Sequence, residues 1–319
     1  MIAAKPQPGL LNESTHLLNF NESVVVKTLL YFNIFNHPLT AEEIEKYCST
    51  PLSFTQLKDL LDSLFKKGLI FKVGKAYSLK DDLTLIHKRN IDAERAERIM
   101  PKARLFSRII SWFPFVKGVF ISGSLSKGVL KEDGDIDYFI VTSGNRLWIC
   151  RSLLILFKKV FLFNSHKYFC LNYFVDENNL TIQEKNIFTA IEIESLIPLY
   201  NFNCFLSFKQ ENKWTKNFLP NTKEPVFFKD KQQSVVVKNF LELCFSNSLG
   251  LSLNNFFKRV TLKYWTKKFQ SSAEINFKEN IKVKDDVAKY HPNRFQEKVL
   301  QKLEEEIAIF ELTTGYKLS

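Results

Sequence analysis

The sequence has few of the residues and runs that mark disulfide-rich, metal-binding or membrane-spanning proteins. Its 319 residues include 5 cysteines and 2 methionines. The cysteines are scattered and form no CxxC pair, so the usual patterns of a disulfide framework or a zinc site are excluded. The most apolar run, at 147–163, is interrupted by Arg151, Lys158 and Lys159 and is too broken for a membrane span. The first residues show no signal-peptide pattern. We therefore expect no membrane partner and a cytoplasmic location.

Common catalytic motifs are also missing. The chain contains no HExxH, GxSxG, GxxxxGK[ST] or GxGxxG sequence. Zincin-type proteases, α/β hydrolases, P-loop nucleotidases and dinucleotide-binding enzymes of the standard patterns are therefore not indicated. The 5 histidines lie far apart and show no metal-ligand spacing.

What the sequence does have is a globular composition and an uneven positive charge. Hydrophobic residues make up 45% and charged residues 25%, and the length suggests more than one domain. The net charge is +11, and 205–291 alone carries 16 Lys or Arg against 8 Asp or Glu. This excess is either a solvated surface or the footprint of a polyanion such as nucleic acid.

The segment 21–88 is predicted to form a small domain after a lead segment at 1–20. Apolar spacing and capping residues predict helices at 23–35, 41–48 and 54–67, and the stretch 69–79 reads as two short strands around a turn. Three helices and a two-stranded wing resemble a winged helix-turn-helix. Such a segment either binds DNA or contacts protein, and its near-neutral charge favours the second role slightly.

The informative motif lies between 115 and 142. A strand is expected at Val116–Ile121, then the turn Gly123-Ser124, and ten residues later Asp135-Ile136-Asp137 at the start of a second strand. The period of two on a strand places both carboxylates on one face. Side-by-side carboxylates repel each other unless a cation intervenes, and Mg²⁺ prefers such oxygen ligands. Glycine also lets the backbone approach a phosphate closely.

This motif resembles that of the nucleotidyltransferase superfamily of the DNA polymerase beta type, in which Gly-Ser precedes Asp-x-Asp on a strand. The resemblance implies that Gly123 and Ser124 contact the triphosphate of an NTP and that Asp135 and Asp137 hold two Mg²⁺ ions. Lys127 would reach the outer phosphates, or it is an ordinary exposed lysine. The implied reaction transfers a nucleoside monophosphate to an acceptor hydroxyl and releases pyrophosphate.

The family's third carboxylate has no obvious counterpart. On the expected strand 167–176, counting by twos places Cys170, Asn172, Phe174 and Asp176 on one face. We assign Asp176 as the third catalytic residue, with Asn172 and Glu192 as the alternatives. If none of them serves, the site could bind nucleotide without turnover.

The remaining chain, 205–319, is predicted to be a mainly helical domain after a nucleotidyltransferase domain at 89–204. Basic residues at 258–268 alternate with Phe256, Phe257, Tyr264 and Trp265, which fits either an acceptor nucleic acid or one buried aromatic face and one solvated basic face. The predicted fold class is α+β. The predicted function is a Mg²⁺-dependent nucleotidyltransferase with a nucleic-acid or protein acceptor, and the alternative is a non-catalytic, nucleotide-sensing regulator or interaction module.

Overall fold

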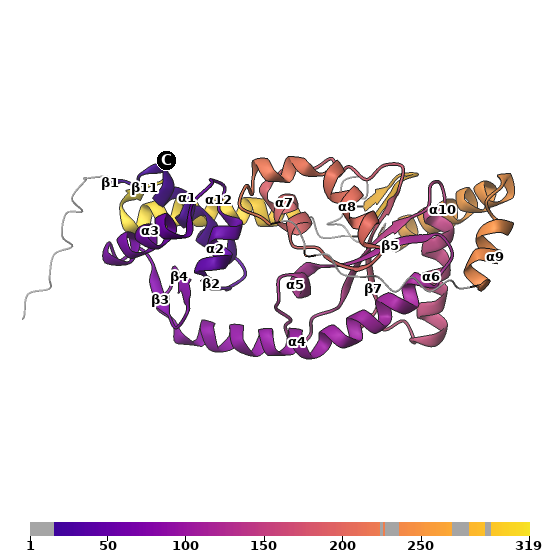
Figure 1. Cartoon of the computed structure of the whole chain (residues 1–319), viewed down its shortest axis with the longest axis horizontal. Helices are drawn as coiled ribbons and strands as arrows, with labels where there is room; N and C mark the ends of the chain where they lie inside the picture. Colours follow the sequence, from indigo (N-terminus) through magenta and orange to yellow (C-terminus); the bar gives the residue numbers. More distant parts are fainter. Residues whose placement is uncertain (1–15, 224–225, 227–235, 270–280, 291–294) are drawn as a thin grey trace, which may run out of the picture.

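The computed structural model describes residues 16–223, 226, 236–269, 281–290 and 295–319 (Figure 1). The predicted lead segment lies, up to residue 15, outside the described residues. Within these ranges, helices are interspersed with strands that form three separate sheets, which confirms the α+β class.

The N-terminal module, residues 16–78, holds three helices and short strands. Its elements are β1 (His16–Leu17), α1 (Phe20–Asn33), β2 (Leu39–Thr40), α2 (Ala41–Tyr47), α3 (Phe54–Lys66), β3 (Phe71–Val73) and β4 (Ala76–Ser78). Asn19, Thr40 and Ser53 each accept a hydrogen bond from the N3 backbone N–H of the helix that follows, which satisfies donors that a helix leaves free. β2, β4 and β3 form an antiparallel sheet in that order. The three helices and two strands predicted here are confirmed.

The central part of the chain builds a sheet with helices on both faces. Its elements are α4 (Leu83–Ser111), β5 (Val116–Ser122), α5 (Gly123–Ser126), β6 (Asp137–Thr142), α6 (Leu147–Phe161), β7 (Cys170–Asp176), α7 (Ile187–Glu194), β8 (Ile197–Tyr200), α8 (Phe202–Glu211) and the 3-10 helix η1 (Lys213–Asn217). α4 runs from the N-terminal module along the molecule to the sheet (Figure 1).

The C-terminal part adds α9 (Val236–Cys244), α10 (Ser248–Phe269), β9 (Ile281–Val283), β10 (Val287–Tyr290), α12 (Phe295–Thr314) and β11 (Tyr316–Lys317). The sheet order is β8-β5-β6-β7-β10-β9. β6 and β7 are parallel, and the other neighbours are antiparallel. Nowhere in the described ranges is a helix both long enough and apolar enough to cross a membrane.

The sheet separates two apolar clusters. One face, with Val119, Ile121 and Ile140, packs against α4, α6 and α10. The opposite face, with Phe120 and Phe139, packs against the phenylalanines of α8. Burial of such side chains supplies most of the driving force for this layered arrangement.

Packing crosses the predicted domain boundaries. The core of the N-terminal module includes Phe188 and Ile191 from α7 and Val299 and Phe310 from α12. β9 and β10, also from the C-terminal region, extend the central sheet instead. The described part of 205–319 is therefore not one separate helical body, because its apolar faces are buried in two different cores.

α6 is joined to α10 by a hydrogen-bonded amide. The first residues of α6 receive no side-chain cap from their own segment. Asn254 of α10, only 2% exposed, accepts hydrogen bonds on Oδ1 from the backbone N–H groups of Trp148 at 2.8 Å and Ile149 at 3.3 Å. A residue more than a hundred positions later thus caps α6 and fixes the two helices side by side.

We predict that Asn254→Ala lowers the free energy of unfolding by about 1–3 kcal/mol, because it leaves two backbone donors unsatisfied in a buried position. Asn255→Ala, at a half-exposed position of the same helix, should change it by less than about 0.5 kcal/mol. Urea denaturation of both variants measures the difference. Equal losses would contradict the capping role of Asn254.

Candidate functional site

Strand register brings Gly123 against Asp137. Ser122, the last residue of β5, pairs with Asp137, the first residue of β6, so the turn after β5 begins beside this carboxylate. Gly123 has a φ of +68°, and a Cβ built on it would clash with Oδ2 of Asp137. Both the left-handed backbone and the closeness of the carboxylate therefore favour glycine here.

The surroundings of the Asp137 carboxylate disfavour its charged form. Its side chain is partly buried, and burial raises its pKa to about 6, with further increases from the neighbouring Asp135 and Glu192 carboxylates. A hydrogen bond with Cys170 and the charge of Lys127 lower the pKa. Burial is the main cause of the raised pKa, and the neighbouring carboxylates add to it. Because those neighbours are negatively charged, this position favours a cation.

Lys127 and Glu192 form an ion pair beside this carboxylate. Nζ of Lys127 lies 2.8 Å from Oε1 of Glu192 on α7 and donates to the carbonyl oxygen of Gly123 at 3.1 Å. Ser124 is exposed one residue after Gly123, and the partly buried Asp135 lies just before β6 rather than on it. The structure therefore brings together five of the six predicted site residues, all except Asp176.

Asp176 lies at the wrong end of the sheet. β6 and β7 are parallel, with Asp137 opposite Cys170 and Thr142 opposite Asp176. Five residues of strand separate Asp137 from Thr142, or roughly 17 Å at about 3.3 Å per residue. The Asp176 carboxylate instead accepts backbone N–H bonds from Asn145 at 2.5 Å and Asn178 at 2.9 Å. It orders the loops at the far edge, and its assignment as the third catalytic residue is wrong.

A bulge explains why counting along β7 failed. The register shifts between Tyr138 and Phe139, whose partners are Leu171 and Tyr173, so Asn172 is the extra residue. Residues after a bulge face the opposite side from the one that a period of two predicts. The residue opposite Asp137 is Cys170, whose pKa is raised by burial and by the Asp137 charge.

Lys289 is a site residue that the sequence did not reveal. It lies on β10 opposite Tyr173, on the face of the sheet that Asp137 shares, and its Nζ lies 5.5 Å from the centroid of the Tyr173 ring. Burial lowers its pKa, while the Glu192 carboxylate raises it. The pairing of β10 with β7, across more than a hundred residues of chain, is the information that the local pattern lacked.

The N-terminal module adjoins the site through α7. Oη of Tyr47 lies 3.2 Å from Oγ of Ser195, directly after α7. Burial and the Arg89 guanidinium lower the pKa of His37 to about 4, and the charge of Lys127 contributes to this decrease. The segment around His37 therefore lies within electrostatic range of the ion pair.

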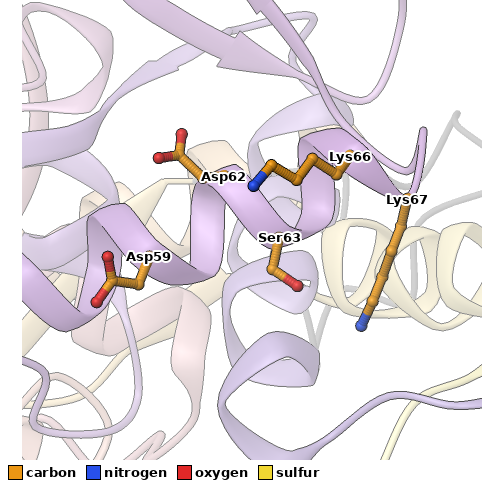
Figure 2. A pocket seen from close by; sticks show the side chains of 5 residues that line it. All are labelled: Asp59, Asp62, Ser63, Lys66 and Lys67. Atoms are coloured by element: carbon orange, nitrogen blue, oxygen red, sulfur yellow. The ribbon is translucent and has the colours of Figure 1, made fainter.

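A separate shallow hollow lies on α3 and contains none of the predicted site residues. Figure 2 shows its lining, which is Asp59, Asp62, Ser63, Lys66 and Lys67. Lys67 is engaged by Glu22, with 2.6 Å between Nζ and Oε1. The two aspartates offset the charge of the two lysines, so this hollow has no excess positive charge to attract a phosphate backbone.

The donor set at Asp135 and Asp137 fits magnesium in its chemistry. Mg²⁺ commonly takes one or two protein carboxylates and completes its shell with waters and substrate phosphates. Across the described ranges, no group of three or more His, Cys, Asp or Glu side chains has the arrangement of a metal site.

Comparisons of the chain with protein-family models, curated proteins and solved structures gave no match.

We predict that the raised pKa of Asp137 makes the folded chain less stable as the pH rises. Between about pH 4 and pH 6 the unfolded chain loses this proton and the folded chain retains it, so the free energy of unfolding falls with pH. A shift of about two units sets an upper limit near 3 kcal/mol, and solvent screening of a partly exposed group reduces it to ~1–2 kcal/mol.

Urea denaturation in EDTA from pH 4 to pH 7.5 tests this. Asp137→Asn should gain stability relative to wild type as the pH rises, whereas Asp133→Asn, at an exposed position of the same loop, should not. A difference between Asp137→Asn and wild type that stays constant with pH would contradict the prediction.

Proposed function

We propose that this protein is a magnesium-dependent nucleotidyltransferase that moves a nucleoside monophosphate from an NTP to an acceptor hydroxyl. The observation that carries the proposal is the contact between the Gly123 turn and Asp137, beside Asp135. A glycine turn lets the backbone approach phosphates, and the paired carboxylates beside it can bind a metal ion, so the arrangement suits a metal-bound nucleotide as substrate. The Gly-Ser and Asp-x-Asp spacing, which resembles that of the polymerase beta superfamily, supports the same reaction.

The residues of the site have distinct roles in this proposal. Asp135 and Asp137 are the metal ligands, and the backbone at Gly123 and Ser124 contacts the triphosphate. Mg²⁺ bound there would stabilise charge on the phosphates and lower the pKa of the acceptor hydroxyl. The acceptor oxygen then bonds to the α-phosphorus, the bond to the bridging oxygen of the pyrophosphate breaks, and the hydroxyl proton passes to solvent.

Two lysines supply the fixed positive charge that the phosphates need. Lys127 donates to Glu192 at 2.8 Å and to the Gly123 carbonyl at 3.1 Å, which leaves the third N–H of its ammonium group for a phosphate. Lys289 lies on the same face of the sheet as Asp137. Charge-assisted hydrogen bonds from ammonium groups to phosphate are stronger than neutral ones. Glu192 is thus a positioning residue for Lys127 in this proposal rather than a third metal ligand in place of Asp176.

A specific observation favours the alternative of a nucleotide sensor. The strand position opposite Asp137 on β7 is occupied by Cys170, a poor ligand for magnesium. A site with two carboxylates and a weak third position can bind a nucleotide with its metal and still react slowly. In that case the N-terminal module, with its resemblance to a winged helix, would respond to occupancy through α7.

We predict that Asp135→Asn and Asp137→Asn each reduce turnover by about 10²- to 10³-fold or more, because both remove charge that stabilises the reacting phosphates. The assay follows pyrophosphate release and label transfer from each α-labelled NTP with Mg²⁺. Asp133→Asn is the matched control and should retain activity.

Each outcome of this assay decides between the two functions. Unchanged activity in both site variants would refute the assignment of the site. Wild-type chain that binds NTP with Mg²⁺ but releases no pyrophosphate would favour the sensor.

We also predict that Lys289→Ala raises the KM for NTP by about tenfold or more, because it removes a charged hydrogen bond to phosphate. Lys289→Arg should retain most of the affinity. Lys284→Ala, at an exposed position directly after β9, is the control and should leave KM unchanged. Steady-state kinetics separate KM from kcat, and a loss confined to kcat would contradict a role in phosphate binding.

A further inference from the structure

α6 and α10 together form a strongly cationic pair of helices. α6 contains three Lys or Arg residues and α10 contains five, and neither helix contains Asp or Glu. The two helices are held side by side through Asn254 and the edge-on contact of Trp148 with Trp265, at 6.5 Å between ring centroids. Much of the net charge of +11 is therefore concentrated on neighbouring helices.

The solvent side of α10 carries one continuous stripe of alternating character. Its members recur at the i, i+3, i+4 spacing that places side chains on one helical face, and all are exposed. They are Phe256, Arg259, Val260, Lys263, Tyr264 and Lys267. Phe256 is 56% exposed and Tyr264 is 57% exposed, so aromatic surface lies open to solvent between cations.

α6 presents a matching stripe beside it. Leu156, Lys159 and Val160 have the same spacing and are exposed, and Phe163 lies exposed just past the helix end. Nζ of Lys159 lies 5.8 Å from the centroid of the Tyr264 ring, which shows that the two stripes adjoin. We call the residues of both stripes the aromatic-basic surface.

The core side of α10 is different. Trp265 is 3% exposed, and the Arg151 guanidinium lies 4.6 Å from its ring centroid. The expectation of one buried aromatic face and one solvated basic face thus holds for Trp265. It does not hold for Phe256 and Tyr264, because their rings lie on the solvated face and not on the buried one. Contiguous exposed apolar area of this kind marks a binding surface.

We propose that the aromatic-basic surface binds a single-stranded nucleic acid. Lysine and arginine would contact successive phosphates, and the rings of Phe256 and Tyr264 would stack on bases, which is how proteins bind single strands without reading a fixed sequence. Charge complementarity selects this occupant, because the surface places cations, without any acidic residue on either helix, between aromatic rings that can stack on bases. The inference does not rest on the carboxylate site, since binding is measurable without turnover.

The test is fluorescence anisotropy of the full chain with a labelled 20-nucleotide oligo-U RNA in EDTA, over a series of salt concentrations. We expect affinity to fall steeply with salt, and the double variant Lys263→Ala with Lys267→Ala to reduce the log–log salt slope by about 1.4, or 0.7 for each phosphate contact. Tyr264→Ala should weaken binding by about 5- to 150-fold with the slope unchanged, and Tyr264→Phe should bind as wild type does.

A matched control is the double variant Lys66→Ala with Lys75→Ala, which removes two exposed cations of the N-terminal module. It should leave binding unchanged. Three results would overturn the proposal: an equal loss in this control, an unaltered affinity in Tyr264→Ala, or weaker binding of RNA than of poly-glutamate or phosphatidylserine vesicles. Unchanged urea midpoints in the Tyr264 variants would verify that the fold is retained.

Discussion

The charge of Asp137 is the constraint on which the site depends. It stands where β5 ends and β6 begins, partly buried, with a second carboxylate nearby. The unfavourable electrostatic free energy of such a carboxylate is reduced when it binds a proton, when ammonium groups lie close to it or when it binds a divalent cation. The structure supplies part of the relief through Lys127, and Gly123 leaves open the space beside the carboxylate that a Cβ would fill. The proposed nucleotide-binding role would account for so unfavourable an arrangement, because perturbed carboxylates cluster at functional sites.

α7 connects this constraint to the rest of the molecule. Phe188 and Ile191 point into the core of the N-terminal module, while Glu192 holds Lys127 at the carboxylates. The next turn brings Ser195 to Tyr47. α7 thus packs into the core of the N-terminal module, while its Glu192 pairs with Lys127 at the carboxylate site. A shift of the N-terminal module would therefore move the Lys127–Glu192 pair. For both candidate functions, the enzyme and the nucleotide sensor, α7 is therefore the physical connection between the N-terminal module and the carboxylate site.

Local pattern was enough for some features of the fold and not for others. Capping residues such as Thr40 and Ser53 revealed helices, and the spacing of Gly123 and Asp137 revealed the turn and strand that meet, because each signal lies within a few residues. The bulge at Asn172 reverses the faces of β7 and cannot be read from alternation alone. The parallel register of β6 and β7, which pairs Asp176 with Thr142 and so places it at the far end from Asp137, is a long-range feature as well. Lys289 reaches the site only through pairing between distant strands. The division of the C-terminal region between two cores likewise depends on long-range packing.

The most direct test of the account is anomalous scattering from Mn²⁺ in crystals of the chain grown with a non-hydrolysable NTP analogue. Manganese takes the same oxygen ligands as magnesium and identifies the metal without ambiguity. We predict a peak between the carboxylates of Asp135 and Asp137 and the phosphates, with the triphosphate along the Gly123 turn. A bound nucleotide and metal elsewhere, with these two carboxylates left to solvent, would contradict it.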